Sequence, residues 1–100
     1  MTTYSRTDSG DETILRIEGT LDAATAPDLR TVVDQIVDEG RKLITLELSS
    51  LRLIDSSGVG VIVSLFKRVR AGGGQVRIQG LRDQPRAIFR LLRLDRVFPT

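Results

Sequence analysis

Hydrophobic positions recur along the chain with two spacings, one typical of strands and one typical of helices. Two early segments, Tyr4–Thr7 and Thr13–Gly19, predict strands on either side of a polar turn at residues 8–12. Apolar residues alternate with polar ones over Leu43–Leu48 and again over Gln75–Gln79, which predicts two further half-buried strands.

The helical spacing is clearest after residue 25. Thr25 predicts an N-cap, Pro27 suits the first turn, and Asp28 complements the positive end of the helix dipole. The helix is expected to end at Gly40, and its apolar face consists of Leu29, Val32, Val33, Ile36 and Val37. A last helix is predicted over residues 85–92, with an apolar face formed by Ile88, Leu91 and Leu92.

The segment Val59–Phe66 is almost wholly apolar and by itself could be a buried strand. The stretch from residue 57 to residue 71 is too long for a typical strand, Asp55 or Ser56 offers an N-cap, and Gly72 begins a glycine stop, so a helix is predicted. Its expected apolar face is Val59, Ile62, Val63, Phe66 and Val69, with Gly60 and Ser64 as a narrow ridge for close packing. Strand, helix and strand then form a parallel crossover, which predicts one α/β domain over residues 1–100.

Composition narrows the class of protein. The chain is 40% hydrophobic but only 4% aromatic, which predicts an aliphatic core and no base-stacking platform. Fifteen basic and thirteen acidic residues leave a net charge of +2, which argues against a dedicated nucleic-acid binder. The chain has no cysteine, so nothing reports on the redox compartment. No signal-peptide core follows Met1 and no apolar run reaches membrane-spanning length, so we expect a cytoplasmic protein.

The stretch "DSSGVG", which begins at Asp55, raises the question of chemistry, because it lies between a strand and a helix. A hydrolase nucleophile at such a corner needs flanking glycines and an activating base, and the chain has no histidine. Nothing in the spacing of Lys42 or Lys67 supports a Ser–Lys pair, and neither a P-loop nor a metal site is visible. Two interpretations are left: Ser56 and Ser57 cap the helix, or a phosphate on Ser56 adds negative charge and repels a partner. The cap is the simpler one on the residues alone.

A run of motifs in order resembles the anti-sigma factor antagonists of the STAS domain family: "LDAATAPDLR", "LIDSSGVGVIVSLFKRVRAGGGQVRI" and "AIFRLLRLDRVF". The similarity extends from about Thr13 to Phe98. It implies a STAS-like α/β fold, with a mixed four- to five-stranded sheet and helices mainly on one face. It also implies a non-enzymatic protein that binds an anti-sigma factor serine kinase and thereby frees a sigma factor for transcription.

The resemblance also assigns roles to residues. The kinase uses its own ATP to phosphorylate the hydroxyl after the motif aspartate, here Ser56 with Ser57 as the fallback, and a metal-dependent serine/threonine phosphatase reverses the step. The antagonist itself is expected to bind no cofactor, to make no direct contact with nucleic acid and not to insert into a membrane. We also expect it to be a monomer. The resemblance implies six partner-binding residues: Asp22, Thr25, Asp55, Ser56, Ser57 and Gly58. An equally good interpretation of Asp22 is that it caps a loop. Gly58 would allow the partner to approach closely.

Two features depart from the family pattern. The chain ends where many members continue into another helix, so apolar surface is expected near Val97 and Phe98. A basic stripe consists of Arg82, Arg86, Arg90, Arg93 and Arg96, and it either forms a solvated helix face over nearby apolar surface or docks an acidic partner. An alternative function is a STAS scaffold without sigma control, in a stressosome or a lipid-transport ABC complex.

Overall fold

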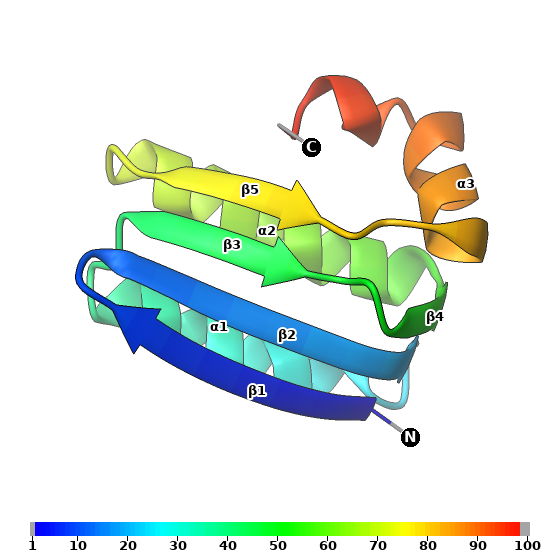
Figure 1. Ribbon diagram of the computed structural model, residues 1–100, viewed down its shortest axis with the longest axis horizontal. Coiled ribbons are helices and arrows are strands. Elements are labelled where there is room, and N and C mark those ends of the chain that lie inside the picture. The colour runs from blue at the N-terminus through cyan, green and yellow to red at the C-terminus, as the bar shows by residue number, and fades with distance from the viewer. Residues whose placement is uncertain (1, 99–100) are drawn as a thin grey trace.

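The computed structural model describes residues 2–98, which form a five-stranded mixed sheet with two long helices on one face (Figure 1). In chain order the elements are β1 (Thr2–Ser9), β2 (Glu12–Leu21), α1 (Ala26–Asp38), β3 (Leu43–Glu47), β4 (Leu51–Ile54), α2 (Ser56–Ala71), β5 (Gln75–Gln79), α3 (Asp83–Leu91) and the short 3-10 helix η1 (Leu94–Arg96). The predicted strands and helices are therefore confirmed. The sequence interpretation missed β4, whose four residues show no alternation between buried and exposed positions.

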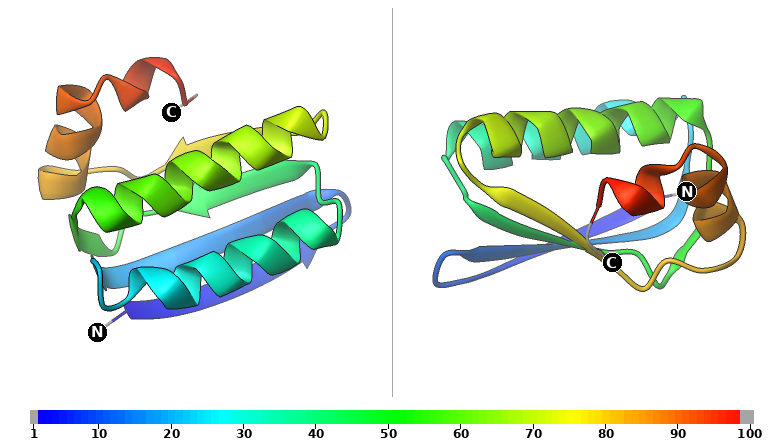
Figure 2. Two further views of the ribbon diagram at one scale, coloured as in Figure 1. Left: turned by 180° about the vertical axis from the view of Figure 1, so that it is seen from behind. Right: turned by 90° about the horizontal axis from the view of Figure 1, so that it is seen from above.

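The strand order is β1-β2-β3-β5, and β4 pairs with the far end of β2, beyond the segment that pairs with β3. β1 runs antiparallel to β2 as a hairpin, whereas β2, β3, β4 and β5 are parallel. Each parallel step needs a crossover, and α1 and α2 supply them on the same side of the sheet. This is the predicted mixed α/β fold with helices mainly on one face (Figure 2).

The core lies between the sheet and α1 with α2. Leu15, Leu46 and Ile78 sit side by side on β2, β3 and β5, and none of the three is exposed. The opposite face of the sheet carries polar side chains such as Arg16 and Arg77, both exposed. No helix covers that face in Figure 2.

The C-terminal part differs from the sequence-based expectation. Leu91 is 76% exposed and Leu92 50% exposed, so the predicted apolar face of α3 is wrong in both positions. Instead α3 buries Phe89, whose ring lies 5.9 Å from that of Phe98. Phe98 in turn packs edge-on against Phe66 of α2, with ring centroids 4.6 Å apart, and is only 2% exposed. The predicted exposure is therefore wrong for Phe98.

Val97, by contrast, is 46% exposed, as expected.

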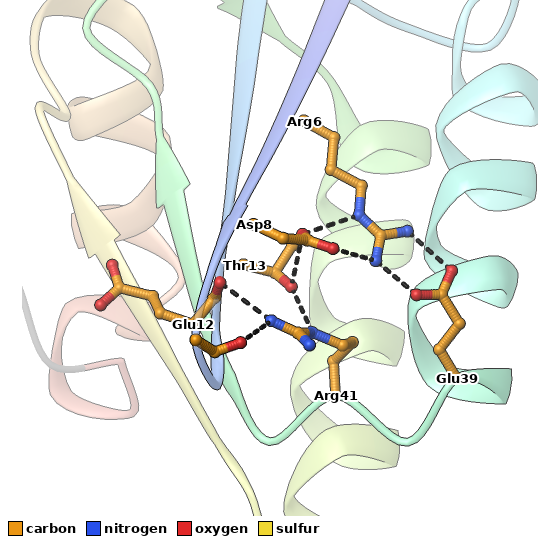
Figure 3. A network of polar contacts seen from close by, with 7 residues as sticks. Arg6, Asp8, Glu12, Thr13, Glu39 and Arg41 are labelled. Carbon is orange, nitrogen blue, oxygen red and sulfur yellow. Dashed lines mark hydrogen bonds and ion pairs between the residues drawn. The ribbon is translucent and has the colours of Figure 1, made fainter.

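A polar network joins the β1–β2 hairpin to the end of α1 (Figure 3). Arg6 donates to Glu39 at 2.6 and 2.9 Å and to Asp8 at 3.1 Å. Buried Thr13 donates to Asp8 at 3.0 Å and accepts from the Nε of Arg41 at 2.8 Å. Hydrogen bonds from Arg6 lower the pKa of both carboxyl groups below their ordinary values. The network fixes the end of the sheet at which β2 begins.

Candidate functional site

The candidate site lies at the opposite end of the sheet, where β2 and β4 finish and α1 and α2 begin. Leu21 pairs with Ile54 at the last position of the two parallel strands, and the N–H of Asp55 donates to the carbonyl of Leu21 at 3.1 Å. Because parallel strands finish at the same edge, the loop after Leu21 and the corner at Asp55 are brought together. Figure 2 shows the first turns of both helices at this end.

Asp55 is the N-cap of α2. Its backbone is extended, with φ −116° and ψ −174°, and one carboxylate oxygen accepts from the N–H of Ser57 at 2.8 Å and of Gly58 at 3.2 Å. These bonds satisfy two of the amide groups that a helix start leaves unpaired, an arrangement worth roughly 1 kcal/mol. Of the two predicted N-cap candidates, the aspartate is the correct one.

The two hydroxyl groups are consequently free of the capping role. Ser56 is the first residue of α2 and is exposed, and its hydroxyl has no hydrogen-bond partner among residues 2–98. Ser57 is half-buried and contacts Asp55 only through its backbone N–H. The interpretation in which these serines cap the helix with their side chains is therefore wrong.

Asp22 organises the neighbouring loop. Its carboxylate accepts from the N–H of Ala24 at 3.0 Å and of Thr25 at 3.1 Å. Thr25 occupies the N-cap position of α1 but makes no capping hydrogen bond with its side chain, so that prediction is wrong in its mechanism. The Thr25 hydroxyl instead donates to the carbonyl of Thr20 at 2.9 Å and ties the loop to the end of β2. These contacts match the loop-cap interpretation of Asp22.

Glycines in α2 have roles opposite to those predicted. Gly58 is buried, and a Cβ built on it would lie 2.6 Å from the Cγ of Leu21 and 2.9 Å from the Cγ1 of Ile54. It faces the core and cannot be the point at which a partner approaches. Gly60 is exposed with open space around it, so the predicted ridge of Gly60 and Ser64 is wrong as well.

Comparisons with known proteins place this geometry in a family. The family model described as the STAS domain matches residues 4–100. The chain belongs to the STAS domain family.

The relatives of this STAS domain carry consistent descriptions. The chain is 31% identical to the anti-sigma F factor antagonist of Paenibacillus polymyxa, over 85% of the chain and 71% of that protein. It is 32% identical to the anti-sigma-B factor antagonist of Bacillus subtilis, over 75% and 68% of the two chains. The crystal structure of a candidate anti-sigma factor antagonist from Thermotoga maritima matches with a TM-score of 0.90 at 27% identity, over 96% of this chain and 83% of that one.

The STAS domain also uses a residue at this site that the sequence interpretation missed. Gln84 of α3 accepts from the N–H of Ile54 and donates to its carbonyl, both at 2.9 Å. Its side-chain amide thus pairs with the edge of β4 opposite β2, as a neighbouring strand would. Thirty positions separate the two residues, and no local pattern in the sequence signals the contact.

Enzymatic alternatives gain nothing from the geometry. Lys42 precedes β3 at the other end of the sheet and contacts the carbonyl of Gly72. Lys67 follows Ser56 by eleven helical residues, which is about 16 Å along the axis. Neither lysine can activate the serine as a base.

The described part of the chain holds no group of three or more acidic, histidine or cysteine side chains suited to a metal ion. Among the described helices, none combines the length and the apolar character that crossing a membrane requires.

Proposed function

We propose that the protein is an anti-sigma factor antagonist that binds an anti-sigma factor serine kinase, and that phosphorylation of Ser56 switches this binding off. The observation that carries the proposal is the state of the Ser56 hydroxyl, which is exposed, unbonded within the described chain and placed directly after the capping aspartate. The names of the two curated relatives support the class of partner.

The electrostatics of the corner explain how one phosphate would act. Asp55 already occupies the amides of Ser57 and Gly58, so a phosphate on Ser56 would not be absorbed by these donors. It would add a charge of about −1.5 to −2 beside an existing carboxylate, with Asp22 on the adjoining loop. Like charges placed against each other at an interface cost several kcal/mol, and each ~1.4 kcal/mol changes affinity tenfold. A partner surface that fits the unmodified corner would therefore be released.

In this proposal the chain supplies the acceptor and no cofactor of its own. The kinase brings ATP, and transfer of its γ-phosphoryl group to the Ser56 oxygen yields ADP, the phosphoserine and a proton. A metal-dependent serine/threonine phosphatase then hydrolyses the phosphoserine and regenerates the hydroxyl. Release of a sigma factor follows from occupation of the kinase by the unmodified antagonist.

The test compares two neighbouring serines. The protein is incubated with ATP and the anti-sigma factor kinase encoded in the same genome, and the modified residue is identified by mass spectrometry. We expect phosphate on the wild type and on Ser57→Ala, and none on Ser56→Ala.

Binding provides the second readout. Ser56→Asp should weaken binding to the kinase by about tenfold or more, whereas Ser57→Asp, at the half-buried position, should weaken it less. An active kinase that leaves both serines unmodified, or equal binding by Ser56→Asp and the wild type, would refute the switch. Capture of a transport ATPase subunit in place of a kinase would favour the scaffold function.

A further inference from the structure

Charge is distributed unevenly along the chain. Residues 67–100 contain nine basic and two acidic residues, whereas residues 1–66 contain six basic and eleven acidic ones. The small net charge of the protein therefore conceals a strongly basic C-terminal third. This part forms the end of α2, then β5, α3 and η1, which lie together on one side of the molecule (Figure 1).

A cavity of about 480 Å³ lies between the end of β5 and α3. Buried Ile78 and Phe89 contribute its apolar lining, and exposed Arg86 and Arg90 line it from successive turns of α3. Neither arginine forms an ion pair with any residue in the range 2–98. One acidic side chain, Asp95, is in the lining. The cavity therefore presents two guanidinium groups without an ion-pair partner among residues 2–98, and a single carboxylate, beside the apolar side chains of Ile78 and Phe89.

Exposed apolar side chains adjoin these charges. Leu91 and Leu92, at the end of α3, are 76% and 50% exposed, so the arginines do not cover them. Protein-binding surfaces combine apolar and charged or polar side chains, and both kinds are exposed together at the end of α3. We define the α3 surface as Arg86, Arg90, Leu91 and Leu92 with the adjoining cavity.

We propose that the α3 surface binds an acidic segment of a partner protein that also carries apolar side chains, at a site separate from Ser56. Charge complementarity selects an acidic partner. It disfavours the symmetric pairing of two copies through this surface, because two such basic surfaces repel each other.

Nucleic acid fits less well. The aromatic side chains of the described chain are buried or packed against the core, so none offers a platform for bases. A lipid surface also fits less well, because the apolar face of α3, with Pro85 and Phe89, points into the protein.

The test uses a fluorescent peptide of alternating glutamate and leucine, with a lysine–leucine peptide as its charge control. Fluorescence anisotropy gives the affinity, and amide chemical shifts locate the contact. We expect the glutamate peptide alone to bind, with shifts in α3 and at Gly80, which also lines the cavity. Arg86→Glu with Arg90→Glu should weaken binding by about tenfold or more. Arg30→Glu, an exposed change on α1, is the matched control and should leave binding unchanged.

Other outcomes overturn the proposal. The proposal is wrong if the glutamate peptide does not bind or if the lysine peptide binds equally well. It is also wrong if Arg30→Glu reduces the affinity as much as the double arginine variant does. If a single-stranded oligonucleotide or phosphatidylserine vesicles bind more tightly than the peptide, and do so through Arg86 and Arg90, the partner of the α3 surface is that ligand and not an acidic protein. Ser56→Ala should bind the peptide as the wild type does, which separates this surface from the switch.

Discussion

The two glycines near the start of α2 offer a sharp test of how the site is packed. Replacing glycine by alanine inside a helix normally stabilises it by roughly 0.5–1 kcal/mol, because the unfolded chain has less freedom to lose. Gly60 meets this condition, since a Cβ there would meet nothing within 4 Å. Gly60→Ala should therefore raise the free energy of unfolding by about that amount.

Gly58→Ala should have the opposite sign. The new methyl group would lie 2.6 Å from the Cγ of Leu21 and 2.9 Å from the Cγ1 of Ile54, whereas real Cβ atoms essentially never approach another heavy atom more closely than 3.0 Å. Both neighbours are buried and belong to the last paired position of β2 and β4, so neither can move away freely. Overpacking of a core costs about 1–3 kcal/mol, against a gain in helix propensity of roughly 0.5–1 kcal/mol, so the expected result is a net loss of up to about 2.5 kcal/mol.

Urea denaturation followed by circular dichroism measures both variants under the same conditions. A loss of 1 kcal/mol lowers the midpoint temperature by roughly 4–8 °C in a domain near this size, so thermal unfolding gives a second measure. Because Leu21 and Ile54 directly precede the two loops of the site, Gly58→Ala should also slow phosphorylation of Ser56, whereas Gly60→Ala should not. Equal stabilisation by the two alanines would refute the packing argument.

Two further predictions concern the polar contacts at the two ends of the sheet. Hydrogen bonds from Arg6 lower the pKa of Asp8 and Glu39, so their contribution to stability is present above the ordinary pKa values of these groups and is lost as the pH falls through the lowered ones. Arg6→Ala should therefore reduce the loss of stability between neutral and acidic pH in urea titrations, and an unchanged loss would contradict the assignment. Gln84→Ala leaves the buried N–H and carbonyl of Ile54 without their partner, which should cost about 1–3 kcal/mol and accelerate hydrogen exchange at that amide. Unchanged exchange would show that the contact is dispensable.

Much of the fold could be predicted from residues close together in the sequence. The helix over Ser56–Ala71 followed from its length, an acidic N-cap candidate and a glycine stop, although its apolar run could have formed a strand. The short strand β4 could not be found in this way. Its pairing depends on β2 lying alongside, and four residues are too few to show a period.

The candidate site divides in the same manner. The local sequence predicted that Ser56 follows Asp55 at the start of a helix. The structure adds that Ser56 is exposed and that its hydroxyl has no hydrogen bond within the described residues. The roles of Gly58 and Gln84 could not be predicted from the sequence, because each role depends on a contact with β2 or β4. Thr25 shows a third case, in which the N-cap position was right but the hydroxyl bonds to β2.

The sequence by itself determined where the three α-helices and four of the five strands lie and which residues make up the corner after β4, because hydrophobic spacing and capping act between residues a few positions apart. Only the tertiary structure decided which glycine of α2 cannot accept a side chain and which serine is exposed to solvent. It also decided that the leucines at the end of α3 are exposed while Phe98 is buried. These outcomes depend on contacts between segments far apart in the chain, where close packing allows one arrangement and excludes others that the local pattern permits equally well.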